Sequence, residues 1–206
     1  MKPSKLIFIR HAIAKKVEGC LPISDPDVII NDSQIKNLAA CLPQDLVWYV
    51  SPLKRTIETA KALSKYVTLR EIILEKDLVE QNFGDWAGKE IVEVWDSLKS
   101  NRSKHNFSFI CPEFIPPSGE SFLAQCERVS RWLEQLHFFD AQTVVVIAHA
   151  GTIRAALSHV LGIEPDKVIG VEILNLSLTT FEVIAEEDDK HRGGRFRLLS
   201  VNNIVN

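Results

Sequence analysis

The sequence has no long hydrophobic run and no excess of positive charge. Its first apolar stretch, Leu6–Ile9, is interrupted by Arg10, so it is too short for a signal peptide or a membrane span. Lys and Arg total 24 against 27 Asp and Glu, and the net charge of −3 gives no overall field that would attract nucleic acid or an anionic membrane. We therefore expect a cytoplasmic protein with no nucleic-acid partner and no membrane partner.

The sequence also lacks any C-x-x-C pair. Its four cysteines are scattered, so neither a zinc-ligand spacing nor a disulfide framework is visible, and we expect free thiols, no metal site and no cofactor. What is present is ordinary globular composition, with 46% hydrophobic and 25% charged residues and no internal repeat or linker. A single domain over residues 1–206 is predicted, as a monomer or a homodimer.

Two short apolar runs, Lys5–Ile9 and Thr143–Ala148, are typical of buried strands in a parallel sheet. The first run is followed by Arg10 and His11, and the second is followed directly by His149. Open α/β sheets bind ligands at the carboxyl ends of their strands. The two imidazoles are therefore expected to share one pocket.

The rest of the sequence alternates between predicted strands and helices, which favours the α/β class. The expected strands are 46–50, 68–74 and a C-terminal antiparallel pair, 171–184 and 195–201, around a turn at 186–194. The expected helices are 33–42 behind an Asp32 or Ser33 cap, 51–66 behind a Ser51 cap, 89–100, 118–136 and 152–161. The proline-broken segment 101–117 is predicted to be an irregular insertion beside the site.

Four motifs occur in one order along the chain: Arg10-His11-Ala12, Ser51-Pro-Leu-Lys-Arg55, Glu80 before a Gly-Asp-Trp loop, and His149-Ala-Gly-Thr-Ile-Arg154. Together they resemble the histidine phosphatase superfamily, the phosphoglycerate-mutase-like fold. The resemblance implies a three-layer sandwich with a mostly parallel central sheet flanked by helices. Segments 117–122, 175–179 and 198–202 look most like the branch of α-ribazole-5′-phosphate phosphatases.

The resemblance assigns roles that elementary chemistry supports. His11 is the expected nucleophile, because a neutral imidazole can attack phosphorus in line and form a phosphohistidine. Arg10 and Arg55 offer forked donors that match phosphate geometry, and Arg55 would lie in the first turn of its helix, where the dipole also favours an anion. Further phosphate contacts are expected from His149, in its protonated form, and from Ala150.

Glu80 is the expected general acid, and it would accept a proton from water in the second step. Its competitors for this role are the nearby carboxylates Glu75, Asp77 and Asp85. Arg154, Trp86 and Ser121 are expected to support the site or to form the substrate rim. The resemblance also marks a departure, since Ala12 and Ala150 stand where family members usually have Gly; alanine resists positive φ, so the local backbone must not need it.

The predicted function is metal-independent hydrolysis of a small-molecule phosphate ester, with α-ribazole 5′-phosphate, and hence cobalamin biosynthesis, as one candidate assignment. Two alternatives stay open from the sequence. One is a phosphotransferase of the phosphoglycerate mutase type, and the other is a non-catalytic phosphate-binding regulatory module with the same fold.

Overall fold

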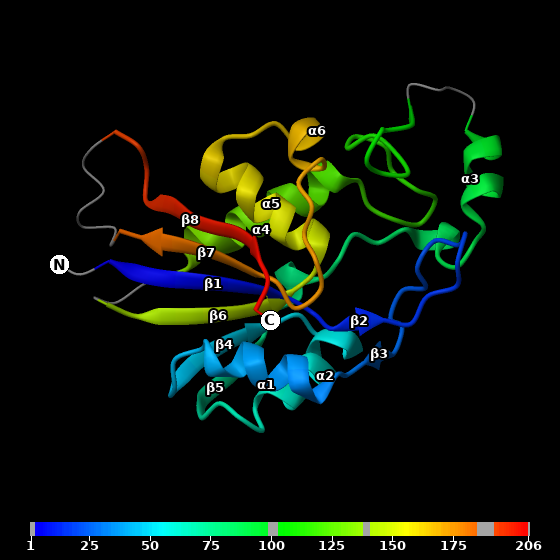
Figure 1. Ribbon diagram of the computed structural model, residues 1–206. Helices are drawn as coiled ribbons and strands as arrows, with labels where there is room; N and C mark the ends of the chain where they lie inside the picture. Colours follow the sequence, from blue (N-terminus) through cyan, green and yellow to red (C-terminus); the bar gives the residue numbers. More distant parts are fainter. Residues whose placement is uncertain (1–2, 99–102, 138–140, 185–191, 206) are drawn as a thin grey trace.

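The structure is a computed structural model that describes residues 3–98, 103–137, 141–184 and 192–205. Its central sheet has six strands in the order β5-β4-β6-β1-β7-β8. In Figure 1, α1 and α2 cover one face of this sheet, while α4, α5 and α6 cover the other. The predicted three-layer α/β arrangement is confirmed.

The bounds of the elements in the described residues are as follows. The strands are β1 Ser4–Arg10, β2 Ile13–Ala14, β3 Val28–Ile29, β4 Leu46–Val50, β5 Leu69–Leu74, β6 Thr143–Ala148, β7 Leu178–Val183 and β8 Phe196–Asn203. The helices are α1 Asp32–Ala40, α2 Lys54–Leu63, α3 Ile91–Ser97, α4 Phe122–Gln135, α5 Ala150–Leu161 and α6 Pro165–Val168, with 3₁₀ turns η1 Lys76–Leu78 and η2 Gly84–Trp86.

The central strands are parallel, and the antiparallel pairing is confined to the C-terminal side of the sheet. β6 pairs in parallel with both β1 and β4, and β5 pairs in parallel with β4. β7 runs antiparallel to β1, and β8 antiparallel to β7. The mostly parallel sheet is therefore confirmed, with β5 at one edge.

Both faces of the sheet are buried, which explains why its inner strands are continuous apolar runs instead of alternating ones. Phe8 and Val146 pack on the side of α4 and α5, together with Trp132. Ile9 and Ile147 pack on the opposite side, against α1 and α2. These two cores fix β1 and β6 firmly, so the residues that follow them are held on rigid supports.

Several predicted boundaries are wrong for identifiable reasons. Helix α1 is capped by Asn31, whose side chain accepts from the backbone N–H of Gln34, not by Asp32 or Ser33. Helix α2 begins at Lys54 instead of Ser51, because Leu53 has an extended backbone and is the N-cap residue. The Ser51 hydroxyl contacts His149 instead of capping the helix.

Other expectations were only partly met. Helix α3 is shorter than the predicted 89–100, and residues 171–177 form a loop, so that β7 starts only at Leu178. Most of the expected turn at 186–194 lies outside the described residues. All four cysteines are free, although only Cys111 is buried. Within the described ranges, no helix combines the length and the apolar character that crossing a bilayer requires.

Candidate active site

The candidate site lies where β1 and β6 end side by side. Arg10 pairs with Ala148 in the parallel register, and the backbone N–H of His11 donates to the Ala148 carbonyl at 3.0 Å. The next residues along each strand are His11 and His149, whose ring centroids lie 5.1 Å apart. Both side chains are buried, so the two strand ends create one enclosed pair of imidazoles.

The His11 ring is oriented by its own backbone. Its Nδ1 lies 2.6 Å from the Ala12 carbonyl, and because a carbonyl only accepts, Nδ1 is assigned as the protonated nitrogen. Nε2 then carries the lone pair. The side-chain amide of Asn175 donates to the carbonyls of His11 at 2.8 Å and Ala12 at 3.3 Å, which fixes this backbone segment.

His11 is neutral at physiological pH. Burial lowers its pKa to about 4, and the positive charges of Arg55 and Arg10 act in the same direction, against the opposing effects of the Ala12 hydrogen bond and Glu80. The Nε2 lone pair is therefore available for attack on phosphorus over a wide range of pH.

Arg55 lies in the first turn of α2 and is buried, as its predicted role requires. Its Nε donates to Nδ1 of His149 at 3.2 Å. Its Nη1 donates to the Ser24 carbonyl at 2.9 Å and lies 3.4 Å from the Asp25 carboxylate. Arg55 thus brings a fixed cation into the pocket beside the histidine pair.

The expectation that His149 is protonated is wrong for this arrangement. Because Arg55 can only donate, Nδ1 of His149 must accept, which leaves the hydrogen on Nε2 to be donated to the Ser51 hydroxyl at 2.8 Å. Burial, followed by the charges of Arg55 and the neighbouring His11, lowers the pKa of His149 well below its ordinary value. The positive charge in the pocket therefore comes from the arginines.

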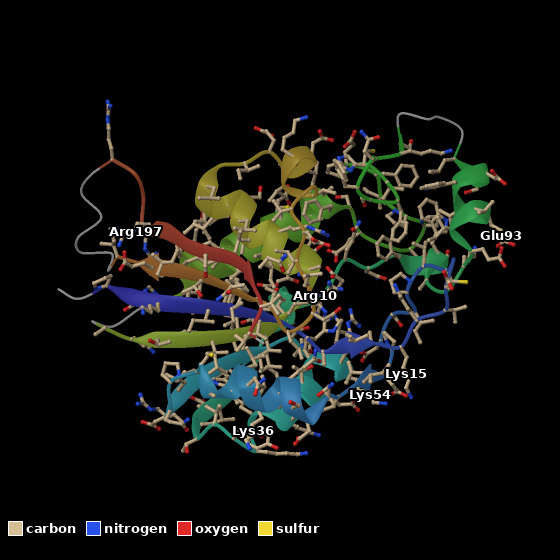
Figure 2. The ribbon with its side chains drawn as sticks, viewed as in Figure 1. Arg10, Lys15, Lys36, Lys54, Glu93 and Arg197 are labelled. Carbon is tan, nitrogen blue, oxygen red and sulfur yellow. The ribbon has the colours of Figure 1, made fainter. Side chains whose placement is uncertain are left out.

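Arg10 projects into the interior from the end of β1, whereas Lys36 and Arg197 lie at the periphery in Figure 2. Its Nη1 donates to the Ile173 carbonyl at 2.5 Å, while its buried Nε–H has no hydrogen-bond partner in the part of the chain that the structure describes. A buried donor of this kind suits an anionic ligand, because an oxygen acceptor would satisfy it.

Glu80 follows η1 and lies beside the arginines. Its carboxylate accepts from Nε2 of Gln125 at 3.0 Å, from the backbone N–H of Gln81 at 3.1 Å and from that of Gly151 at 3.2 Å. The residue keeps some solvent exposure, although protein atoms surround its carboxylate. Burial alone would raise the pKa of Glu80, but these hydrogen bonds and the charge of Arg55 outweigh burial and lower it.

Two of the three competing carboxylates make local contacts instead. Glu75 caps η1 through the backbone N–H of Asp77, and Asp85 accepts from the Ser118 hydroxyl. Of the four candidates, it is Glu80 that faces the positive side chains of the pocket, since Arg10, Arg55 and Arg154 all interact with its charge.

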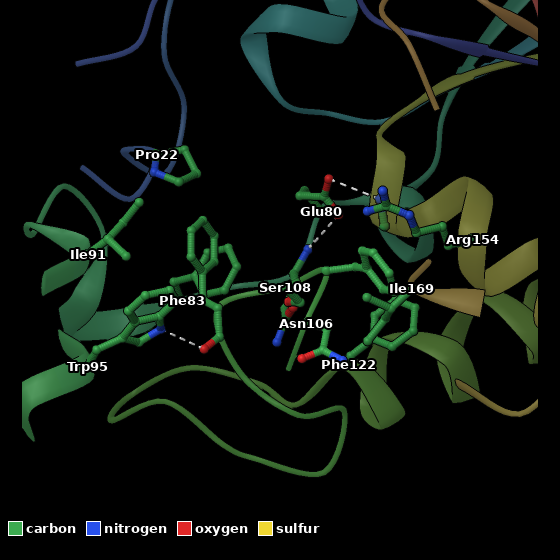
Figure 3. Close-up of a pocket in the computed structure, with 14 residues that line it drawn as sticks. Pro22, Glu80, Phe83, Ile91, Trp95, Asn106, Ser108, Phe122, Arg154 and Ile169 are labelled. Carbon is green, nitrogen blue, oxygen red and sulfur yellow. Dashed lines mark hydrogen bonds between the residues drawn. The ribbon is translucent and has the colours of Figure 1, made fainter. Parts of the chain in front are cut away.

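A cavity of about 610 Å³ opens on one side of Glu80. Glu80 and Arg154 lie on one wall (Figure 3), and the opposite wall is largely aromatic. Gly151 also lines this cavity. Segment 106–109 of the predicted insertion contributes to the lining of this cavity. The apolar lining residues are Phe83, Ile91, Trp95, Phe107, Phe109, Phe122 and Ile169.

A second cavity, of about 290 Å³, meets the first at Glu80 and Gln81. It is lined by Arg55 together with Ser24 and Leu53. The carboxylate of Glu80 thus lies between the smaller cavity, which Arg55 lines, and the larger cavity, whose lining is largely aromatic. This arrangement can hold a phosphate near the arginines while an attached organic group occupies the larger cavity.

Two of the residues expected to support the site or to form its rim, Trp86 and Ser121, line neither cavity. Trp86 stacks on Phe114 with ring centroids 5.4 Å apart and is buried in a small satellite core, so the tryptophan that lines the larger cavity is Trp95. Ser121 accepts from the backbone N–H of Ala124 as the cap of α4 and lines neither cavity. Both residues are close in sequence to motifs of the site, but the Trp86 side chain packs on Phe114 and the Ser121 side chain caps α4.

The remaining predicted residues fit the site without strain. Arg154 lines the larger cavity, with its Nε donating to the Val171 carbonyl at 2.8 Å. Ala150 is the first residue of α5, where free backbone N–H groups favour an anion. Neither Ala12 nor Ala150 has positive φ, so alanine in place of the family's glycine costs no backbone strain.

Sequence reasoning did not identify Gln125, Asp25 or Ser51 as contacts of the site. Gln125 was not identified because it occurs within the amphipathic pattern of a helix. Ser51 was not identified because a Ser-Pro pair is typical of a helix start, so its side chain was expected to cap a helix. Among the described residues, no group of three His, Cys, Asp or Glu side chains could hold a metal ion.

The chain is similar to known proteins over most of its length. The sequence model of the histidine phosphatase superfamily (branch 1) matches residues 6–202. Phosphoserine phosphatase 1 of Hydrogenobacter thermophilus is 31% identical over 182 residues, which cover 79% of each chain.

Solved structures show the same fold at lower sequence identity. Bacillus stearothermophilus YhfR has a TM-score of 0.79 at 19% identity, covering 98% of both chains. A putative α-ribazole-5′-P phosphatase from Escherichia coli has a TM-score of 0.74 at 20% identity, again over 98% of both chains. The predicted phosphoglycerate-mutase-like fold is confirmed.

Proposed function

The chain belongs to the histidine phosphatase superfamily (branch 1) and is a phosphatase, and from this premise we propose that it hydrolyses a small phosphate monoester through a phosphohistidine on His11. The observation that carries the proposal is the state of the His11 ring. Nε2 of a neutral, buried imidazole bears a lone pair, beside two arginines and a carboxylate. No metal ion is needed, because these cations can stabilise the charge on the transferring phosphoryl group.

In the first step, the Nε2 lone pair of His11 forms a bond to phosphorus as the bond from phosphorus to the ester oxygen breaks. Arg10 and Arg55 stabilise the equatorial oxygens. The departing alkoxide takes a proton from Glu80, which must first be protonated; a bound phosphate dianion favours that form by repelling the carboxylate charge.

In the second step, Glu80 is a carboxylate and accepts a proton from water. The water oxygen attacks phosphorus, the phosphorus–nitrogen bond breaks, and its electron pair returns to Nε2 of His11. Inorganic phosphate and free alcohol are the products. The lowered pKa of Glu80 supports this base role.

The larger cavity supports an ester whose alcohol carries a flat apolar group. Aromatic side chains such as Phe83, Trp95 and Phe109 suit stacking or edge contacts with a ring system. α-Ribazole 5′-phosphate, which bears a fused aromatic base, is our candidate substrate. The alcohol parts of phosphoserine and 3-phosphoglycerate are small and polar, and they would leave much of this aromatic lining uncovered.

The test is phosphate release in EDTA from α-ribazole 5′-phosphate, 2-naphthyl phosphate, phosphoserine and 3-phosphoglycerate, with isomerisation of 3-phosphoglycerate followed in parallel. Acid- or alkali-quenched reactions are assayed for a base-stable, acid-labile phosphoenzyme. His11→Ala is compared with His159→Ala, because His159 contacts Ser130 between α4 and α5, away from the pocket.

We expect turnover that survives EDTA, favours the two aromatic esters and is lost in His11→Ala but kept in His159→Ala. Isomerisation of 3-phosphoglycerate without phosphate release would favour the mutase-type alternative. Folded wild-type protein that binds phosphate and turns over none of the esters would favour a non-catalytic module.

A further inference from the structure

Gln125 is a fully buried amide on the face of α4 that packs against the core. Its Nε2 lies 3.0 Å from Oε1 of Glu80, with the Val79 carbonyl and the Thr152 hydroxyl each at 3.3 Å. A buried amide is costly unless its hydrogen-bonding groups are used. Its closest partner is the carboxylate to which we assign both proton transfers.

The Glu80 carboxylate is held from two sides with little free space. Gln125 binds Oε1 from α4, and the backbone N–H of Gly151 binds Oε2 from the start of α5. A Cβ placed on Gly151 would lie 2.2 Å from Oε1 of Glu80 and 2.8 Å from Oε1 of Gln125. In this arrangement the three groups fit together because residue 151 is glycine, and a side chain there would displace the Glu80 carboxylate.

We propose that Gln125 is a positioning residue that holds Glu80 and partners it in both its base and acid forms, the charged carboxylate more strongly than the acid. The proposal rests on the proposed function, in which Glu80 must give up a proton in one step and take one up in the next. Gln125 is fully buried and its shortest hydrogen bond goes to Glu80, so we assign its effect to Glu80 and not to a substrate contact.

An amide suits this task because it carries a donor and an acceptor on the same carbon. With the NH₂ end toward Glu80, Gln125 stabilises the carboxylate. Its Oε1 is buried and has no hydrogen-bond partner within the described parts of the chain. A half-turn of the amide would bring this acceptor to the protonated carboxyl group, so that the side chain could pair with either form.

The charged groups around Glu80 cannot pair with both its carboxylate and its protonated form. Arg10 from β1, Arg55 from α2 and Arg154 from α5 all interact with its charge and favour the carboxylate. His11, also at the end of β1, faces the same carboxylate but is neutral at pH 7. Removing Gln125 leaves all four groups in place, which makes its own contribution measurable.

The first test is Gln125→Met, which keeps the side-chain length and removes the amide. We expect kcat on 2-naphthyl phosphate to fall about 10-fold while KM changes less than 2-fold, since no substrate contact is lost. The falling alkaline limb of kcat/KM should move up by at least about 0.5 pH unit, because loss of the donor disfavours the carboxylate. Gln125→Asn, one methylene too short to reach Glu80, should give the same shift.

The second measurement does not depend on turnover. The Cδ resonance of Glu80 is followed by NMR against pH in protein labelled with ¹³C-glutamate, with Glu80→Gln giving the assignment. The midpoint should be higher in Gln125→Met and Gln125→Asn than in the wild type. Thr152→Val is the matched control, because its hydroxyl contacts Gln125 but not Glu80; it should leave the midpoint within about 0.2 unit.

An unchanged Glu80 midpoint and an unchanged alkaline limb in folded Gln125 variants would overturn the proposal and make Gln125 a packing residue. A wild type that turns over no ester would count against the proposed function instead, while the NMR titration would still decide whether Gln125 controls Glu80.

Discussion

His11 and His149 face each other from adjacent parallel strands, with their rings inclined at 61°. The two rings have different hydrogen-bonding duties: His11 donates from Nδ1 to the backbone, whereas His149 accepts at Nδ1 from Arg55. Both are buried and neutral, so neither disturbs the other by charge repulsion. The pair can therefore place one free Nε2 beside two permanent cations, which is the arrangement that attack on a phosphate dianion requires.

The neutral state of His11 predicts a pH-dependent stability. Because its pKa is about 4 in the folded protein and about 6.5 unfolded, the unfolded chain binds the proton first as the pH falls through this window. The free energy of unfolding should then drop by about 3 kcal/mol from this residue between pH 7 and pH 4. Urea unfolding at pH 7, 5.5 and 4.5 measures the slope.

His11→Asn isolates that contribution. Its slope between pH 6.5 and 4.5 should be shallower than that of the wild type by up to about 1.4 kcal/mol per pH unit. His149 and Glu80, whose folded pKa values are also lowered, keep their contributions in this variant and lose stability in the same direction. Equal slopes for the two proteins would mean that folding does not lower the pKa of His11, contrary to the neutral, buried state assigned to it.

Gly151→Ala should damage the site while sparing the fold. The new Cβ would lie 2.2 Å from Oε1 of Glu80, so the carboxylate must move away from its present position. We expect kcat/KM to fall about 100-fold, since a displacement of about 1 Å in a reacting group can cost that much. Steady-state kinetics with 2-naphthyl phosphate would measure the loss.

Gly162→Ala, at the other end of α5, is the matched control. Gly162 has φ of +62° and open space around the position of a Cβ. Alanine there should cost about 1 kcal/mol of stability through backbone strain, with kcat/KM unchanged. If the two variants lost activity equally, general disturbance of α5 would explain the effect better than contact with Glu80.

Much of the fold could be predicted because burial on both faces of the sheet leaves a strong trace in the sequence. The apolar runs at β1, β4 and β6 coincide closely with the observed strands. The predicted element boundaries are wrong where residues contact the site instead of continuing a strand or a helix. Segment 171–177 alternates like a strand, but its Ile173 carbonyl accepts from Arg10, and Asn175 holds the backbone at His11.

The parts of the site that follow strand and helix ends could also be predicted, because the order of elements fixes where those ends meet. His11, Arg55 and His149 are brought together in this way. Gln125 could not be found, since a buried amide in the middle of an amphipathic helix gives no periodic signal. The charge state of His149 was also beyond reach, because it depends on burial and on which nitrogen faces Arg55.

Trp95 and Trp86 should respond differently to substitution by alanine. Trp95 lines the larger cavity and is about one-third exposed, at 37%, so Trp95→Ala should raise KM for 2-naphthyl phosphate about 5-fold and barely change the melting temperature. Trp86 is buried against Phe114, and Trp86→Ala should cost about 3–5 kcal/mol of stability.

KM values and melting curves measured side by side for the two variants check that Trp95 contacts the substrate and that Trp86 stabilises the fold. Phosphoserine serves as the small comparison ester, and its KM should be insensitive to Trp95→Ala. An equal rise in KM for both esters would indicate that Trp95 supports the phosphate pocket, contrary to our view that it contacts the organic group.

Asn175 should support catalysis by holding the backbone that orients the nucleophile. Its amide donates to the carbonyls of His11 and Ala12, and the latter also accepts from Nδ1 of His11. Asn175→Ala should lower kcat about 10-fold and the free energy of unfolding by about 1 kcal/mol, with a smaller change in KM.

Asn31→Ala is a control of equal stability cost, about 1 kcal/mol, because it removes the exposed cap of α1. Kinetics and urea unfolding of both variants separate the two effects: only Asn175→Ala should lose turnover, and a similar loss in Asn31→Ala would assign the defect to reduced stability.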